Sequence, residues 1–441
     1  MWEVVVVMHL GAESFVDQRR WPRLVEVPEA RLMGRRAADV TRRLESLLAS
    51  AGINVDGRDV PFFSMRDGQV IDRIVADGWL GLAEGFMAGQ WSADPLPEVL
   101  GVLLRQPFES GVGRFISSRR HRRTSRSTEH GLGARELPEG LVELYAGATR
   151  ATGAAQFSAA PRTTATEELM VPVGRGRRQK VTLPVDVTWL GEPEGADRQD
   201  LDDCQMRRIE TMLDEAGVRR GDRVLELPSS GGQMAIQAAL RGASVDVLCA
   251  DEEHADSVEA RVRAAGVAGA VHVEVIGSLV PSPRQWSGQY EAIVSVERME
   301  TLGEVGLRHY VKSIDRMLAT GGVAVVQAIV AHEDMRDTAR ESLEVMREYL
   351  WPALEYPTVA EVRAAVLGQT GLTVSAENYV GSHLRTTLPL WRANFLARER
   401  QAAAAGFDQV FRRLWDYQLA LHEALVNAGD IDCVQFVLRP R

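Results

Sequence analysis

The sequence predicts an α/β protein in which a mostly parallel sheet carries helices on both faces, preceded by a smaller α/β domain. From residue 205 onward, short apolar runs alternate with helical patterns, as in parallel sheets. The apolar run 223–227, a tight turn and a helix starting at residue 232 form the strand-turn-helix unit of doubly wound sheets. Because 441 residues exceed what one core usually organises, two domains are expected.

Residues 1–112 are predicted to form the smaller domain. Apolar spacing over residues 31–51 predicts a helix. Residues 70–91 are also apolar but contain four glycines, which argue against one uninterrupted helix and favour turns or close backbone packing. The valine-rich run 4–8 lacks the basic region and cleavage site of a signal peptide, so we interpret it as an ordered strand or an artefact of the start site.

Residues 113–200 are predicted to be a linker or lid. Six arginines and His121 crowd into residues 114–126, and residues 134–195 show no clear period. Two interpretations of the basic stretch stay open. It is either a mobile linker or an arginine patch that meets lipid phosphates at an anionic surface.

Residues 201–441 are predicted to hold seven strands with helices between them. The expected strands are 223–227, 244–249, 271–276, 291–296, 323–329, 372–379 and 433–438. The expected helices are 205–216, 232–241, 252–265, 305–319, 335–349, 358–368, 388–403 and 407–428. A ligand is expected beyond the carboxyl ends of the first strands, as in other doubly wound sheets.

The turn after the first of these strands departs from the glycine-rich pattern of ligand-binding turns. Where an acidic residue and three alternating glycines are expected, the chain has Glu226, Pro228, Ser230 and Gly232. Glycine allows positive φ and close approach of a ligand, whereas proline fixes φ and removes an N–H donor. The turn is therefore predicted to offer fewer backbone contacts to a ligand.

Charge and cysteine content exclude several classes of protein. The net charge of −10 argues against a nucleic-acid partner. Three scattered cysteines are too few for a disulfide framework, so the protein is expected in the reducing cytoplasm. The cysteines do not form a metal cluster, and His254, His332 and His383 lack metal-ligand spacing, so we assign no metal. No apolar run reaches the roughly 20 residues of a membrane span, so membrane contact is expected to be peripheral, at the inner face.

Ordered motifs through nearly the whole chain carry a family resemblance. They include residues 78–81, 84–91, 205–209, 290–297, 300–303, 349–352, 388–391 and 432–435. With these motifs the chain resembles the cyclopropane-fatty-acyl-phospholipid synthase family, including the mycolic acid methyltransferases, and most of all the branch that methylates oleoyl chains towards tuberculostearate. The resemblance implies a Rossmann-like, seven-stranded methyltransferase domain.

The resemblance also implies a reaction. Such enzymes transfer a methyl group from S-adenosylmethionine to the double bond of a phospholipid acyl chain through a carbocation, and bound bicarbonate is their usual base. Glu300 matches the family's active-site glutamate, and Ile329 matches a position whose backbone faces the bicarbonate. The family's Tyr-Ser-Cys-Ala segment has no counterpart in residues 150–157, and Leu384 replaces a tyrosine. We therefore expect no bicarbonate. Weak or absent binding of S-adenosylmethionine is expected for a different reason, because Pro228 and Ser230 replace two glycines of the turn.

Six residues are candidates for the site. For binding S-adenosylmethionine they are Gln205, Glu226, Gly231, Gly232 and Asp251, and for catalysis Glu300. Glu226 either binds the cofactor's ammonium group or caps the following helix, and Asp251 either binds ribose hydroxyls or is the N-cap of the helix after it. Glu300 is either a proton-transfer group in an apolar pocket or a hydrogen-bond anchor for its loop.

Three functions remain open at this point. The chain is a C-methyltransferase acting on the unsaturated acyl chain of a phospholipid, a cyclase-like enzyme of the same fold without methyl transfer, or a non-catalytic paralogue that binds lipid or partners an active homologue. A homodimer is a further possibility. An apolar tunnel is expected between the sheet's carboxyl edge and helices 388–403 and 407–428, whose aromatic side chains either line it or pack in the core.

Overall fold

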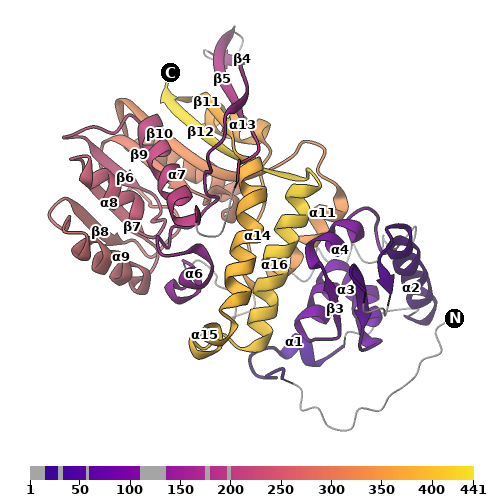
Figure 1. Ribbon diagram of the computed structural model, residues 1–441. Coiled ribbons are helices and arrows are strands. Elements are labelled where there is room, and N and C mark those ends of the chain that lie inside the picture. The colour runs from indigo at the N-terminus through magenta and orange to yellow at the C-terminus, as the bar shows by residue number, and fades with distance from the viewer. Residues whose placement is uncertain (1–14, 28–32, 56–58, 110–135, 174–178, 196–199) are drawn as a thin grey trace.

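The computed structural model describes residues 15–27, 33–55, 59–109, 136–173, 179–195 and 200–441 (Figure 1). The valine-rich run 4–8 and the basic stretch 114–126 lie outside these ranges. The main sheet has nine strands in the order β4-β5-β11-β12-β10-β9-β6-β7-β8. Their bounds are β4 Pro161–Val173, β5 Gln179–Leu190, β6 Arg223–Glu226, β7 Ser244–Cys249, β8 Val271–Val275, β9 Tyr290–Val296, β10 Leu318–Ala331, β11 Leu372–Tyr379 and β12 Ile431–Pro440.

The seven predicted strands are confirmed as β6 to β12. Strands β10, β9, β6, β7 and β8 run parallel to one another, and β12 lies antiparallel between β10 and β11. Parallel pairing brings the carboxyl ends of β6, β7, β9 and β10 to one edge of the sheet. The turns after these strands therefore lie together there, as the sequence predicted.

Helices connect the strands and cover the sheet (Figure 1). They are α7 Leu201–Glu215, α8 Gln233–Leu240, α9 Glu252–Ala264, α10 Gly303–Met317, α11 Asp337–Ser342, α12 Glu344–Tyr349, α13 Val359–Gln369, α14 Gly381–Ala397, α15 Glu399–Ala404 and α16 Gln409–Asn427. Helix α14 starts seven residues before the predicted Leu388, with Pro389 inside it. A proline is favoured in the first helical turn, which is why the pattern alone placed the start too late.

The described residues between 139 and 190 have more regular structure than the predicted linker or lid. They form α6 (Glu139–Ala146) and the long antiparallel hairpin of β4 and β5. Residues Asp186–Trp189 of β5 pair with β11 and so extend the main sheet, while the rest of the hairpin projects beyond it (Figure 1). Val185 and Val187 are buried, but most of the hairpin's described side chains are not, so no strong apolar period marks it in the sequence.

The amino-terminal part forms a small α/β unit, as predicted. Its elements are α1 Pro22–Val25, α2 Met33–Ser50, β1 Asn54–Val55, β2 Phe62–Met65, α3 Gln69–Met87, β3 Trp91–Asp94 and α4 Leu96–Leu103. Helix α3 is kinked at Gly78, where φ is 56° and ψ is −123°. An ideal Cβ on Gly81 would lie 2.0 Å from the carbonyl oxygen of Arg73, so this position needs glycine. The glycines therefore mark a kink and a close backbone approach.

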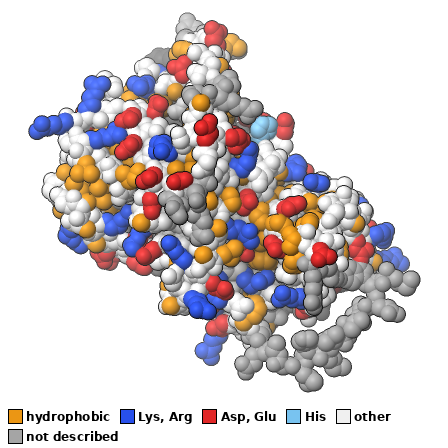
Figure 2. Space-filling view, in the orientation of Figure 1, with side chains coloured by type: hydrophobic (Ala, Val, Ile, Leu, Met, Phe, Trp, Pro, Cys, Tyr) orange, Lys and Arg blue, Asp and Glu red, His pale blue; other side chains and the backbone are white. Residues whose placement is uncertain are grey.

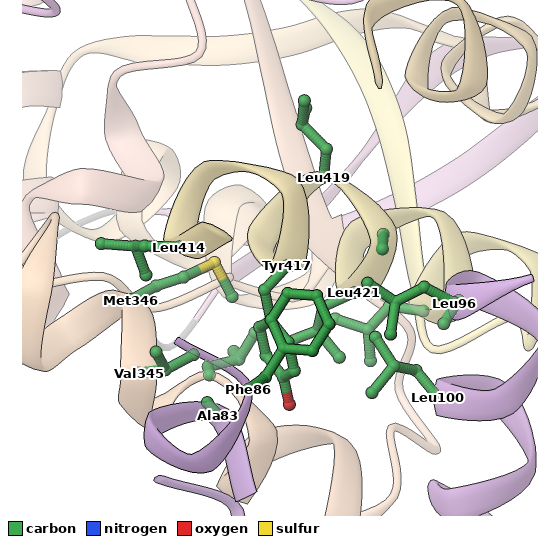
Figure 3. Packing of buried hydrophobic residues seen from close by; sticks show 14 of the residues in the cluster. Ala83, Phe86, Leu96, Leu100, Val345, Met346, Leu414, Tyr417, Leu419 and Leu421 are labelled. Carbon is green, nitrogen blue, oxygen red and sulfur yellow. The ribbon is translucent and has the colours of Figure 1, made fainter. Parts of the chain in front are cut away.

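Helix α16 joins the amino-terminal unit to the rest of the molecule. Figure 3 shows Leu414, Tyr417 and Leu421 of α16 among side chains from α3, α4 and α12. One hydrophobic cluster runs from the amino-terminal unit through α14 and α16. Helices α14 and α16 lie between this unit and the main sheet (Figure 1). The amino-terminal unit thus supports the helices that face the sheet's carboxyl edge.

The visible surface shows no field of a single charge sign. Arg, Lys, Asp and Glu side chains are intermixed over the described part of the face in Figure 2. Within the described ranges, every helix is too short or too polar to cross a bilayer.

Candidate functional site

The turn after β6 is held by hydrogen bonds within the chain. The carboxylate of Glu226 accepts at Oε1 from the backbone N–H of Ser230 (2.6 Å) and from its hydroxyl (2.7 Å). The N–H of Ser229 donates to the carbonyl of Leu248, and the N–H of Gly231 donates to the hydroxyl of Ser229. Three N–H groups that a glycine turn would offer to a ligand thus have partners in the protein.

Residues 149–155, called here the covering segment, lie against this turn. The N–H of Thr152 donates to the carbonyl of Ser230 (3.2 Å), and the guanidinium of Arg261 donates to the carbonyls of Gly231 and Thr149. Gly231 has a φ of 103°, and a Cβ there would lie 2.6 Å from the carbonyl oxygen of Arg150. Gly231 therefore permits a contact between two backbones.

Glu226 has a structural contact and one free oxygen. Its Oε1 braces the turn, whereas its Oε2 has no hydrogen-bond partner among the described residues. Burial raises the pKa of this carboxyl, and the hydrogen bonds from Ser230 oppose the shift. Glu226 lies behind the turn rather than in the wall of the cavity described below. Its role toward a cofactor stays a prediction.

Asp251 is the N-cap of α9. Its Oδ1 accepts from the N–H of His254 (2.9 Å), and its Oδ2 accepts from the N–H of Glu136 (3.1 Å). The capping interpretation is confirmed. Contact with ribose hydroxyls would have to share oxygens that already accept two hydrogen bonds, and this role stays a prediction.

Gln205 orients the covering segment. Its side-chain amide donates to the carbonyl of Gly153 (2.9 Å), and its Oε1 accepts from the guanidinium of Arg208 (3.1 Å), which also donates to the carbonyl of Thr152. Gln205 is fully buried and outside the wall of the cavity. Any effect on a cofactor would therefore act through the backbone of the covering segment.

A cavity of about 140 Å³ lies at the carboxyl edge of the sheet. One part of its wall comes from the turn after β6 and its neighbours, including Ser229, Gly231, Thr152, His254 and Arg298. Another part comes from α14, α16 and the segment after α12, including Leu388, Trp391, Trp415, Leu419 and Trp351. A polar region thus continues into an apolar one, in the position where the sequence predicted a tunnel.

The aromatic side chains in α14 and α16, and Phe407 just before α16, pack in the core, and two of them also line the cavity. Trp391 and Trp415 line the cavity. Phe395, Phe411 and Tyr417 are buried in the cluster shared with the amino-terminal unit, and Phe407 packs against it. Trp391 and Trp415 also belong to this cluster, so both alternatives left open by the sequence apply to these two side chains, whereas the core alternative applies to the others.

Glu300 lies in the wall between the two regions, on the short 3₁₀ helix Met299–Thr301. Its Oε1 accepts from the backbone N–H of Ile329 (3.2 Å), and its Oε2 has no partner among the described residues. Burial, reinforced by the nearby Glu297, raises the pKa of Glu300 to about 8. Glu300 thus anchors its loop, and its other oxygen remains available for proton transfer or for a positive charge.

Glu297 belongs to the same site, although the sequence indicated it only as the last residue of the motif 290–297. It has a φ of 46°, which is uncommon for a residue with a side chain. Its Oε1 accepts from the N–H of Ala154 (2.7 Å) and from the amide of Gln327 (3.0 Å), whose own carbonyl oxygen accepts from Gln435. The carboxylate therefore joins the covering segment to β10. The feature that distinguishes Glu297 is its positive φ. A backbone angle cannot be read from a sequence, so the sequence did not single this residue out.

We expect Glu300 to make the stability of the protein depend on pH. Because its pKa is about 8 in the folded protein and near 4.5 otherwise, the folded state retains a proton that the unfolded state has released over this interval. The Glu300 contribution to stability therefore falls as pH rises from about 5 to 8. We expect Glu300→Gln to raise the melting temperature, with a gain that is small at pH 5 and largest above pH 8. A gain that does not change with pH would contradict this account.

Other chemistry is limited among the described residues. Within the described ranges, no cluster of three or more His, Cys, Asp and Glu side chains is placed to hold a metal ion. Cys204, Cys249 and Cys433 are buried thiols.

The parallel sheet, the turn after β6 and the cavity at the carboxyl edge define a protein of the Rossmann-like methyltransferase class. The chain belongs to the mycolic acid cyclopropane synthetase family, which matches residues 194–436.

Comparisons with individual proteins agree with this assignment. The chain is 27% identical to the tuberculostearic acid methyltransferase UfaA1 of Mycobacterium tuberculosis, over 96% of both chains. It is 21% identical to the cyclopropane-fatty-acyl-phospholipid synthase of Escherichia coli, over 90% of this chain and 92% of that one. The cyclopropane synthase MmaA2 of M. tuberculosis shares the fold, with a TM-score of 0.54 and 18% identity over 68% of this chain and 94% of that chain.

Proposed function

We propose that this protein is an S-adenosylmethionine-dependent methyltransferase that acts on the acyl chain of a lipid, more narrowly on the double bond of a phospholipid acyl chain. The observation that carries the proposal is the continuity of the cavity. It places the turn after β6, the free oxygen of Glu300 and the apolar faces of α14 and α16 around one space.

The polar region fits the positive charge of S-adenosylmethionine. Glu136, Glu139 and Glu297 contribute carboxyl groups to the wall beside Ser229 and Gly231. Arg298 and Arg150 pair with Glu136 and Glu139 respectively, which offsets part of that charge. When bound, S-adenosylmethionine supplies an electrophilic methyl group. The residues of this region would hold and orient it, and Glu300 would face the charge.

The apolar region fits an acyl chain. Leu388, Trp391, Trp415 and Leu419 come from helices fixed by the core shared with the amino-terminal unit. Their side chains would exclude water from the reacting double bond, and their aromatic faces stabilise a nearby positive charge. A carbocation formed on the acyl chain needs both conditions.

Incubation with methyl-deuterated S-adenosylmethionine and oleoyl phospholipid tests the proposal. Mass spectrometry of the released fatty acids should reveal a fatty acid that has gained one deuterium-labelled carbon. This product should appear only when both substrates are present. If no label enters any acyl chain, the proposal fails.

Affinity for S-adenosylmethionine is expected to be weak, because the N–H groups of the turn are already paired and Pro228 has none. Each missing contact costs on the order of 1 kcal/mol. We expect the double change Pro228→Gly and Ser230→Gly to tighten binding by about tenfold, equivalent to about 1.4 kcal/mol. Calorimetric titration measures it. Micromolar binding by the unchanged protein would contradict this expectation.

The paired N–H groups of the turn also favour a second candidate, a lipid-binding protein without methyl transfer. It would bind oleoyl phospholipid, seen as a rise in melting temperature, yet transfer no label. Three further expectations from the sequence remain proposals. They are domain boundaries near residues 112 and 200, peripheral contact with a membrane, and association with a second copy of the chain or with a homologue.

A further inference from the structure

A tyrosine–histidine pair lies in the wall of the cavity. Tyr356, in the segment after α12, and His422, on α16, are both buried and both line the space. The phenol oxygen of Tyr356 is 2.5 Å from Nε2 of His422. Neither residue belongs to the motifs that carried the family resemblance.

The hydrogen bonds fix the direction in which this pair can accept a proton. Nδ1 of His422 lies 2.8 Å from the carbonyl oxygen of Gln418. Because a carbonyl can only accept, Nδ1 carries the hydrogen, and Nε2 of the neutral ring accepts from the hydroxyl of Tyr356. Burial lowers the pKa of His422, which keeps the imidazole neutral. Nε2 of His422 is therefore placed to accept the proton of the Tyr356 phenol.

The backbone holds Tyr356 next to Glu300. The N–H of Glu355 donates to the carbonyl of Glu300 (2.8 Å), and the carbonyl of Pro357 accepts from the N–H of Ala331 (3.0 Å). Burial raises the pKa of the Tyr356 phenol, the nearby Glu300 and Glu297 raise it further, and Arg347 lowers it. The pair thus occupies the same part of the cavity as Glu300.

Glu297 and His254, two other basic groups of the wall, are less suited to take a proton. Glu297 already accepts two hydrogen bonds at Oε1. His254 also lines the cavity, but neither of its ring nitrogens has a partner among the described residues, so nothing there fixes its tautomer, and it lies on α9 beside the turn. The covering segment and Leu384 carry no thiol or phenol.

We propose that Tyr356 and His422 together accept the proton that the acyl chain loses after methylation, an inference that rests on the proposed function. The π pair of the alkene forms the new C–C bond to the methyl carbon, the pair of the broken S–C bond stays on sulfur, and the second alkene carbon becomes positive. One C–H bond then breaks, either on the transferred methyl group, where its electron pair bonds to the positive carbon and closes a cyclopropane ring, or on the carbon next to the positive one, where it forms a double bond. Its proton goes to the oxygen of Tyr356, whose own proton moves to Nε2 of His422.

The variants Tyr356→Phe and His422→Gln test this assignment. Tyr417→Phe is the matched control, because it removes the same hydroxyl from a buried tyrosine on α16 that faces the amino-terminal unit instead of the cavity. We expect both test variants to form labelled product at least about 100-fold more slowly, with lipid affinity and melting temperature near those of the unchanged protein. The control should keep its rate.

A kinetic isotope effect separates a chemical role from a structural one. With trideuterated methyl donor and perdeuterated oleoyl chains, the isotope effect should be larger in Tyr356→Phe than in the unchanged protein, because loss of the proton becomes rate-limiting. An active Tyr356→Phe variant with an unchanged isotope effect overturns this inference and leaves the proposed function intact. If the unchanged protein transfers no methyl group, the proposed function fails, and the role of the pair fails with it.

Discussion

Glu300→Gln is expected to slow methyl transfer by about 100-fold or more while the protein remains folded. The substitution keeps the size of the side chain and an acceptor for the N–H of Ile329, but it removes the charge that the carboxyl group can develop opposite a cation. Groups placed to stabilise developing charge in a water-poor site typically contribute 10²–10³ in rate. The label-transfer assay measures the change, with Glu304→Gln on the exposed start of α10 as the control.

The pH dependence of the same reaction gives a second view of Glu300. With a pKa of about 8, the carboxyl group is mostly protonated at neutral pH in the free protein. The rate at low substrate concentration should therefore rise as pH increases towards 8, and this rise should be absent from Glu300→Gln. A variant within threefold of the unchanged protein at every pH would remove Glu300 from the chemistry.

Gly81→Ala is expected to destabilise the protein by about 3 kcal/mol or more, which is at the upper end of the cost of overpacking. The added Cβ would lie 2.0 Å from the carbonyl oxygen and 2.3 Å from the carbonyl carbon of Arg73, and backbone cannot move aside as a flexible side chain can. Chemical denaturation measures the loss. Because the amino-terminal unit shares its core with α16, the cavity should lose order in the same variant.

Gly101→Ala is the control for this substitution. Gly101 lies inside α4, and nothing lies within 4 Å of a Cβ placed there. Alanine is favoured over glycine inside a helix by about 0.5–1 kcal/mol, so this variant should be as stable as the unchanged protein or more so. Equal losses at the two positions would show that the close approach at Gly81 is not the cause.

Strands β6, β7, β9, β10 and β12 were predictable because each contains a buried apolar run, which local sequence records directly. The N-cap at Asp251 was predictable for a similar reason, since capping depends on neighbours in the chain. The place of the β4–β5 hairpin in the main sheet was not, because Asp186–Trp189 join it to β11 across 190 residues of sequence. Pairing of this kind leaves no local pattern.

The candidate site likewise contains residues that could be predicted from the sequence and residues that could not. Glu300 was recognised by resemblance, and its burial between apolar neighbours was expected. The hydrogen bond between Tyr356 and His422 joins positions 66 residues apart, and the role of Gln205 depends on where residues 152 and 153 cross it. Such contacts are set by the packing of whole elements, so the identity of the residues alone did not indicate them.

The claim that methyl donor and acyl chain meet at Glu300 is tested most directly by an experimental structure with S-adenosylhomocysteine and an oleoyl phospholipid analogue. We predict the sulfur near Ser229 and Gly231, the acyl chain between Trp391 and Trp415, and the double bond beside Glu300 and Tyr356. Because the cavity measures about 140 Å³, the side chains of α14 and α16 that line it should change rotamer to admit the chain, while the two helices stay in place. An acyl chain bound elsewhere, or a cavity that admits one ligand only when the other is absent, would contradict the account.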